Sequence, residues 1–252
     1  MTRDRILYED NHLIIVNKMP SEITQGDKTG DEPMGEGVKR YLKEKYQKPG
    51  NVFLGVVHRL DRPVSGAVIF ARTSKALARM NELQQKREIR KVYWAVVGSS
   101  QNPPPVPLPS RREGEPKGEG SWIALMHYLR KNEQQNKSYA YDEPGPGRLK
   151  AELKYRKIAS SDRYDLIEVE LLTGRHHQIR AQLAAAGMII KGDLKYGAPR
   201  SNPDGSIHLH SRLVEFIHPV SGAFIHVVAP VPEEKLWQVF SKLNAVSLPS
   251  AD

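Results

Sequence analysis

The chain has 252 residues, of which 39% are hydrophobic and 27% are charged, a balance typical of a globular protein rather than a disordered one. Its formal net charge of +9 favours a polyanionic partner such as a nucleic acid, because lysine and arginine displace the counterions around phosphates. Cysteine is absent, which excludes disulfides, thiolate metal sites and thiol nucleophiles. No apolar run reaches the length of about 18 residues that spans a membrane, and residues 1–12 lack the apolar core of a signal peptide, so we expect a soluble cytoplasmic protein.

Apolar residues in alternation, bounded by turn residues, predict strands that pair mainly as hairpins. The first hairpin covers residues 6–17 and turns at Asp10-Asn11. Further strands are expected at 52–57, 67–71, 89–97, 149–158, 163–172, 207–217 and 223–229. The pattern of residues 121–141 does not distinguish a helix from a strand.

Apolar residues three or four positions apart predict the helices. Thr73 or Ser74 can cap the second helix, while the third opens at Thr173-Gly174 and ends at Gly187. The expected helices cover 38–46, 74–87, 173 to about 186, and a C-terminal segment that begins at Pro232 and buries Leu236, Phe240 and Leu243.

The order of these elements predicts an α+β fold. Strands occur as hairpins with a few helices between them, and no repeated strand–helix–strand alternation appears, so the sheet should be largely antiparallel or mixed. Residues 98–120 are rich in proline, glycine and charge and form a longer loop than compact domains usually contain. This loop could divide two domains. We interpret it as an insertion in a single domain, 1–252, because the later strands need partners from the first half.

One carboxylate stands among basic residues in the segment GVVHRLDRPVSG, residues 55–66. If the preceding strand continues through it, Arg59 and Asp61 share one side while Leu60 faces the core. A neighbouring guanidinium favours the ionised carboxylate, so Asp61 could act as a nucleophile or a base. The alternative is a salt-bridged aspartate in a turn.

Two further clusters could carry chemistry. Residues 172–180 lie where a strand gives way to a helix, and free N–H groups together with Arg175 would suit a phosphate; the alternative is a capped helix with exposed basic residues. Tyr93 lies in a strand beside cationic residues and could stack on a nucleobase or simply pack.

Histidines could suggest a metal site. His208 and His210 share a strand face, and His176 and His177 are adjacent, but no HExxH motif accompanies them. Glycine-rich nucleotide-binding motifs are also missing from the sequence. We therefore expect neither a metal nor a cofactor.

Five motifs stand out along the chain: VNK (16–18), HRLDRPVSG (58–66), RKVYWAVV (90–97), LLTGRHHQIRAQLAAAG (171–187) and IKGDLKYG (190–197). Taken together, these motifs resemble the RNA pseudouridine synthases of the RluA type, over residues 6 to about 230. The resemblance implies an α+β fold whose central, mostly antiparallel mixed sheet carries a basic cleft. It also implies isomerisation of uridine in ribosomal or transfer RNA: the C1′–N1 bond breaks, the uracil turns, and C1′ joins C5.

The resemblance assigns roles to individual residues. Asp61 acts on the sugar, either by attacking C1′ or by taking a proton so that a glycal forms. Tyr93 stacks on the uracil and takes part in proton transfer at C5. Arg180 forms the ion pair that orients Asp61, with Arg175 as the second choice. Arg59 enters the RNA stack, because a stacked uridine hides C1′ and C5 from any side chain.

Other expectations concern the RNA and the departures from the family. Val64 stands where the family usually has threonine, and the first motif departs from NKPxG after Lys18. We expect no N-terminal S4 domain, so the catalytic domain and its 98–120 insertion should recognise the target RNA. We also expect the protein to be a monomer. The residues expected to bind RNA are His58, Arg59, Arg62, Arg175 and His177.

Two alternative functions stay open. The first is a non-catalytic RNA-binding or ribosome-assembly protein on this fold, and the second is a metal-dependent hydrolase.

Overall fold

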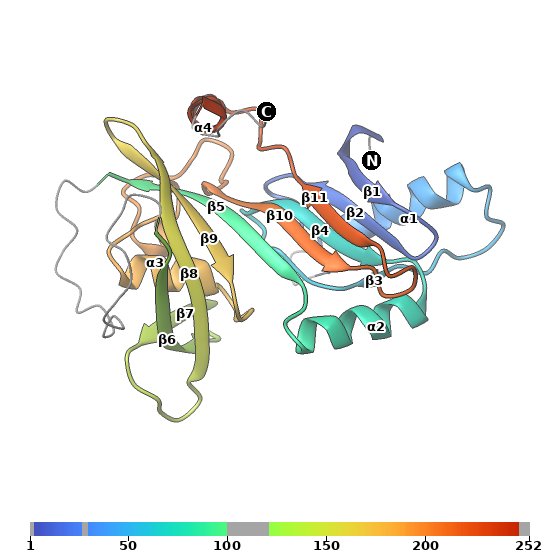
Figure 1. Ribbon diagram of the computed structural model, residues 1–252, viewed down its shortest axis with the longest axis horizontal. Helices are drawn as coiled ribbons and strands as arrows, with labels where there is room; N and C mark the ends of the chain where they lie inside the picture. The colour runs from blue at the N-terminus through green and yellow to red at the C-terminus, as the bar shows by residue number, and fades with distance from the viewer. Residues whose placement is uncertain (1–2, 27–29, 100–120, 247–252) are drawn as a thin grey trace. The chain divides into compact units, whose positions relative to one another are not determined.

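The computed structural model describes residues 3–26, 30–99 and 121–246 (Figure 1). The chain divides into two compact units. Unit 1 comprises residues 1–91, 204–206 and 210–232, and unit 2 comprises residues 92–203, 207–209 and 233–252. The proline- and glycine-rich insertion lies outside the described residues, apart from its first two, and the single-domain organisation stays a prediction.

Unit 1 combines a mixed sheet with helices. Its strands follow the order β1-β2-β4-β10-β11, with β3 also paired to β4, and only the β4–β10 pair is parallel among those described. Helix α2 packs on β3 and β4, as Figure 1 shows. The elements are η1 (Arg3–Arg5), β1 (Ile6–Glu9), β2 (Leu13–Lys18), α1 (Met34–Lys45), β3 (Gly55–Val56), β4 (Ser65–Ala71), α2 (Ser74–Gln85), β10 (Leu209–Ile217) and β11 (Phe224–Val228).

Strand β4 forms the centre of unit 1. Every residue of its sequence SGAVIFA is buried, because β2 and β10 flank it and both of its faces are covered. A continuous apolar run is the pattern of such a strand. Side chains from β2, β4, α2 and β10 share one apolar cluster, which includes Leu13, Ile69, Met80 and Val214.

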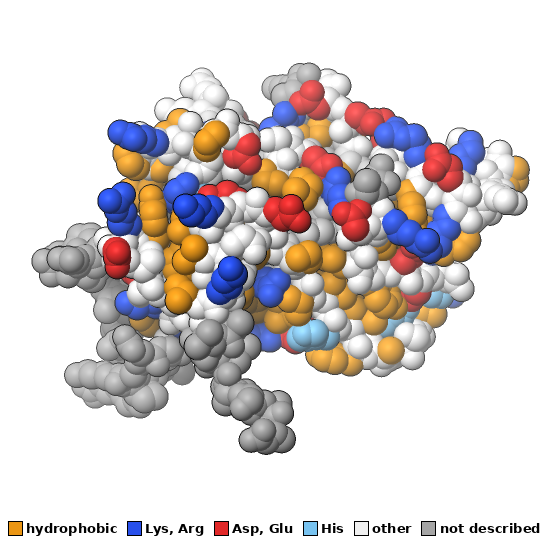
Figure 2. Space-filling view, turned by 90° about the horizontal axis from the view of Figure 1, so that it is seen from above, with side chains coloured by type: hydrophobic (Ala, Val, Ile, Leu, Met, Phe, Trp, Pro, Cys, Tyr) orange, Lys and Arg blue, Asp and Glu red, His pale blue; other side chains and the backbone are white. Residues whose placement is uncertain are grey.

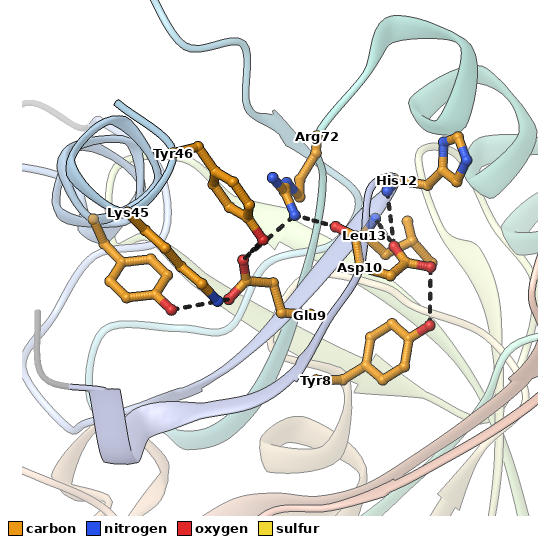
Figure 3. A network of polar contacts seen from close by, with 9 residues as sticks. Tyr8, Glu9, Asp10, His12, Leu13, Lys45, Tyr46 and Arg72 are labelled. Atoms are coloured by element: carbon orange, nitrogen blue, oxygen red, sulfur yellow. Dashed lines mark hydrogen bonds and ion pairs between the residues drawn. The ribbon is translucent and has the colours of Figure 1, made fainter. Parts of the chain in front are cut away.

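Polar contacts join the first hairpin to α1, as Figure 3 shows. The Glu9 carboxylate accepts hydrogen bonds from Tyr41 (3.0 Å), Lys45 (2.8 Å) and Tyr46 (2.7 Å). Burial raises the pKa of Glu9, but these donors outweigh it and hold the pKa below its usual value. The backbone N–H of Leu13 donates to the Asp10 carboxylate at 2.7 Å, which closes the predicted turn.

Unit 2 contains an antiparallel sheet in the order β5-β9-β8-β6-β7. One face packs on α3 through Leu129, Ala151 and Ala181. The elements are β5 (Arg90–Gly98), β6 (Ile123–Asn132), β7 (Lys137–Tyr141), β8 (Leu149–Ser160), β9 (Tyr164–Leu171), α3 (Gln178–Ala185), η2 (Leu194–Tyr196) and α4 (Lys235–Val246). The predicted α+β class is confirmed, and residues 121–141 contain a hairpin.

Three predicted helices need correction. Helix α1 begins at Met34 rather than at residue 38. Helix α3 begins at Gln178 rather than at Thr173-Gly174, because His177 has a left-handed backbone (φ 52°) that an α-helix does not contain, although Gly187 (φ 75°) follows its end as expected. Among the side chains of α4 that are described, Trp237 and Phe240 are buried, whereas Leu243 is 41% exposed.

Among the residues that the structure describes, no helix combines the length and the apolar character that a membrane crossing requires. This finding agrees with the hydropathy of the sequence.

Gly66 should tolerate no side chain. Its φ is 114°, and a Cβ built on it would lie 2.3 Å from the Ser211 carbonyl oxygen on the parallel neighbour β10. We expect Gly66→Ala to lower the free energy of unfolding by about 3 kcal/mol or more, through backbone strain and overpacking. Urea denaturation measures the loss. Gly98→Ala is the control, because nothing lies within 4 Å of a Cβ there; equal losses in the two variants would contradict the explanation.

Candidate active site

The loop after β3 carries Asp61 in unit 1. Its residues alternate in exposure: His58 and Leu60 are each 8% exposed, Arg59 is exposed, and Asp61 is half-buried. The Leu60 backbone is fixed by Thr24, whose Oγ1 donates to the Leu60 carbonyl (3.3 Å) and lies 3.4 Å from the Leu60 nitrogen. The expected burial of Leu60 is confirmed, and it leaves the neighbouring Asp61 partly accessible.

His58 fastens the start of this loop to β4. Its Nε2 accepts the backbone N–H of Ile69 at 3.2 Å. Burial, reinforced by the charge of Lys91, lowers the pKa of His58 to about 3, so the imidazole is neutral and keeps this acceptor at physiological pH. The expected RNA contact of His58 stays a prediction.

Lys18 holds the turn that follows Asp61. Its side chain is fully buried at the end of β2, and its Nζ donates to the carbonyl oxygens of Met19 (3.1 Å), Arg62 (2.9 Å) and Val64 (2.6 Å). Burial lowers the pKa of Lys18 to about 7, although the Glu22 and Asp61 carboxylates oppose this shift. The motif VNK contains this residue, but no role was predicted for it from the sequence.

The turn itself is closed by a hydrogen bond from the Val64 N–H to the Asp61 carbonyl (3.0 Å). Arg62 forms an ion pair with Asp31 at 2.6 Å, and its carbonyl accepts the N–H of Ser21. Val64 is 2% exposed and packs as an apolar side chain where the family usually has a hydroxyl. The backbone around Asp61 is therefore fixed from several directions.

Arg180 is fixed in unit 2 by a buried carboxylate. Its Nε and Nη2 donate to the two oxygens of Asp193 at 2.7 and 2.8 Å, and the two side chains are 6% and 1% exposed. Its Nη1 lies 3.0 Å from Nε2 of His177, and its guanidinium lies 5.1 Å from the ring centre of Tyr196. The motif IKGDLKYG contained Asp193 and Tyr196, yet no role was predicted for either.

His177 also contacts the Arg180 guanidinium. Because arginine only donates hydrogen bonds, His177 Nε2 must accept, and its proton is on Nδ1, which contacts the Tyr196 hydroxyl at 3.1 Å. The same hydroxyl donates to the Ser138 carbonyl and accepts the Ser138 N–H, both at 2.9 Å. His177 is 8% exposed, and its expected RNA contact stays a prediction.

The remaining predicted site residues lie in both units. Tyr93 is 5% exposed on β5, opposite Val169 of β9. Arg175 is exposed; its N–H donates to the Gln178 side chain at 2.9 Å and its Nε to the Lys150 carbonyl at 3.1 Å. Thus Asp61 and Arg59 belong to unit 1, whereas Tyr93 and Arg180 belong to unit 2.

The charges on the surface are mixed. On the face shown in Figure 2, lysine and arginine side chains lie among acidic ones, so the net charge of +9 is not gathered there into one basic patch. The basic cleft that the resemblance implies stays a prediction. The described part of the chain contains no group of three or more histidine, aspartate and glutamate side chains suited to a metal ion.

Comparison with known proteins decides the family. A model of the family described as RNA pseudouridylate synthase matches residues 12–185. The chain belongs to this family. It is an RNA pseudouridine synthase by class, an isomerase, and the resemblance inferred from its motifs is confirmed.

Individual relatives agree with this assignment. The ribosomal large subunit pseudouridine synthase C of Buchnera aphidicola is 34% identical over 236 residues, which are 90% of this chain and 67% of the relative. The corresponding synthase D of Xylella fastidiosa is 31% identical and aligns with 95% of this chain and 69% of the relative. The human RNA Pseudouridylate Synthase Domain Containing 4 shares the fold, with a TM-score of 0.71 at 20% identity and coverage of 96% and 93%.

Lys18 should make stability depend on pH. Its pKa is about 7 in the folded protein and 10.5 in a model chain, so the unfolded chain binds more protons between these values. The free energy of unfolding should therefore rise with pH across this window, by about 1 kcal/mol per pH unit from this group. Urea denaturation between pH 7 and 10 should show a smaller rise in Lys18→Met than in the wild type. The exposed Lys75, changed to Met, is the control, and an unchanged slope in Lys18→Met would contradict the prediction.

Removing Asp193 should leave the Arg180 guanidinium buried without its carboxylate. We expect Asp193→Ala to lower the free energy of unfolding by about 3–5 kcal/mol, because a buried charge that loses its hydrogen-bonded carboxylate is costly. Urea denaturation measures this loss. Glu36→Ala breaks the exposed ion pair with Lys39 and should cost much less. Similar losses in both variants would show that Asp193 does not stabilise a buried charge.

Proposed function

We propose that this protein converts uridine to pseudouridine in ribosomal RNA, with Asp61 as the group that acts on the ribose. The observation that carries the residue assignment is the half-buried Asp61 on a loop whose backbone is fixed by Lys18 and Thr24. The names of the Buchnera and Xylella relatives support large-subunit RNA as the substrate.

The proposed reaction conserves all atoms. The C1′–N1 bond of the uridine breaks, the uracil turns, a C1′–C5 bond forms, the proton on C5 leaves, and N1 gains a proton. An ionised carboxylate suits both possible first steps, attack on C1′ or removal of a ribose proton to form a glycal. Asp61 therefore serves in either case. The first route passes through a covalent ester that breaks when C1′ bonds to C5, and the second passes through a glycal whose lost ribose proton Asp61 returns when that bond forms.

We further propose that Arg180 orients Asp61. A guanidinium presents its N–H donors in a rigid plane, and the contacts with Asp193 and His177 fix the orientation of that plane. A carboxylate that contacts such a guanidinium is held in a defined direction. The pair would hold the Asp61 carboxylate in one orientation.

The base must leave the RNA stack before the reaction begins. The exposed Arg59 next to Asp61 is proposed to fill the vacated space, and Tyr93 to contact the extruded uracil. Arg62 and Arg175 are proposed to bind phosphates near the extruded uridine. Action in the cytoplasm and as a monomer stays a prediction.

Replacing Asp61 should remove the activity and spare binding. Asp61→Asn keeps the size of the side chain but cannot act as a nucleophile or base, so we expect pseudouridine formation to fall by roughly a thousandfold or more. RNA affinity should change by no more than about threefold, since uncharged asparagine adds no repulsion. Mass spectrometry of nucleosides from a large-subunit RNA transcript measures product, and fluorescence anisotropy measures affinity.

The matched control is Asp31→Asn, the same chemical change at the partner of Arg62. It should keep most of the activity. Product formation by Asp61→Asn at the wild-type rate would refute the catalytic assignment. A wild-type protein that modifies transfer RNA transcripts but no large-subunit transcript would refute the substrate assignment alone.

A further inference from the structure

The β6–β7 hairpin of unit 2 carries a hollow of about 550 Å³ that the proposed chemistry does not use. Its walls come from two adjacent strands and the turn between them. The lining residues are Arg130, Lys131, Asn132, Glu133, Gln134, Tyr139 and Tyr141.

The strand register places aromatic and basic side chains together on this hairpin. Arg130 lies opposite Tyr139, and Tyr128 lies opposite Tyr141. Side chains at alternate positions share a face, so these four project on one side of the hairpin, while Leu129 is buried on the side that packs on α3. The aromatic and basic groups are thus left on the side away from α3.

Tyr139 has the properties of a stacking surface. Its side chain is 38% exposed, and its hydroxyl donates to the Gln135 side chain, which restrains the ring. The Lys137 ammonium lies 5.2 Å from the ring centre. The neighbouring Tyr141 already stacks with a planar cation, since the Arg148 guanidinium lies 3.8 Å from its ring centre.

The charge of the hollow favours an anion. Within the described ranges, Arg130 is exposed and forms no ion pair with an acidic side chain. The carboxylate of Glu133 is 2.6 Å from the Lys131 ammonium, which offsets its charge. Arg130 is therefore available to contact a phosphate next to the exposed ring of Tyr139.

We propose that this hollow binds an unpaired nucleotide of the RNA substrate, whose base stacks on Tyr139 while a neighbouring phosphate contacts Arg130. The inference rests on the proposed function, since it assumes an RNA substrate. Aromatic rings beside cations are the usual recognition surface for single-stranded RNA. An acidic peptide would use the cations and leave the exposed ring without a role.

A nucleotide in the hollow would be held at a fixed place relative to Arg180. The hairpin is tied to Tyr196 through both backbone groups of Ser138, and Tyr196 contacts His177, which contacts Arg180. Lys195 also donates to the Gln135 and Asn136 carbonyls at 3.2 and 3.0 Å. The hollow should therefore help to select and align the RNA, and its loss should raise KM and leave kcat unchanged.

Binding of large-subunit RNA transcripts and of a fluorescent adenosine oligonucleotide of about 12 nucleotides tests the proposal. Tyr139→Ala should weaken binding about tenfold and raise KM to match, while Tyr139→Phe keeps the ring and stays near wild type. Arg130→Ala should weaken binding and lower the slope of log affinity against log salt by about one. Arg130→Glu tests the same hollow should Tyr139→Ala fail to fold.

The matched control is Arg163→Ala, which removes the same charge from the β8–β9 turn outside the hollow. Equal weakening by Arg163→Ala and Arg130→Ala would overturn the proposal, since it would show a general charge effect. Wild-type binding by Tyr139→Ala, or equal competition by a polyglutamate peptide, would also overturn it. A wild type that binds the transcripts but forms no pseudouridine would refute the proposed function, and the binding comparisons would still decide on the hollow.

Discussion

A buried ammonium group determines the backbone on which Asp61 stands. Lys18 reaches from the end of β2 to the carbonyls of Arg62 and Val64, so the turn after Asp61 has little freedom to move. Desolvation makes this costly, which is why the pKa of Lys18 falls to about 7. The desolvation of Lys18 is offset by the fixed backbone that it gives to the loop of Asp61, the proposed catalytic carboxylate.

In unit 2 the roles of the two charges are reversed. The cation of interest, Arg180, is itself buried, and Asp193 and His177 hold it by its nitrogen atoms. In unit 1 a buried cation organises the backbone beside a carboxylate, and in unit 2 a buried carboxylate organises a cation. In each unit, a buried group of one charge thus fixes the surroundings of a group of the opposite charge.

The sequence predicted those features that depend on local patterns. The apolar run of β4 and the threonine cap of α2 were visible because burial and capping leave local signatures. The role of Lys18 could not be predicted, because two of the carbonyls that it binds lie 44 and 46 residues away along the chain. The role of Asp193 could not be predicted either, because it lies 13 residues beyond Arg180. The start of α3 was misjudged because Thr173-Gly174 resembles a cap, whereas contacts of His177 with Tyr196 accompany the left-handed turn. Residue type alone left the role of Asp61 open, and its proposed catalytic role came from the family resemblance.

The interleaving of the two units along the chain has a consequence for biosynthesis. Unit 1 consists of residues 1–91 together with residues 204–206 and 210–232, and β4 pairs with β10 through Ser65 and His210. A chain emerging from the ribosome therefore displays the Asp61 loop long before the strand that completes its sheet has been made. The apolar strand β4 therefore stays incompletely covered until the last third of the chain has been translated. Completion of the unit 1 sheet is thus a late event in synthesis, and a chain truncated before β10 lacks the strand that pairs with β4 in parallel.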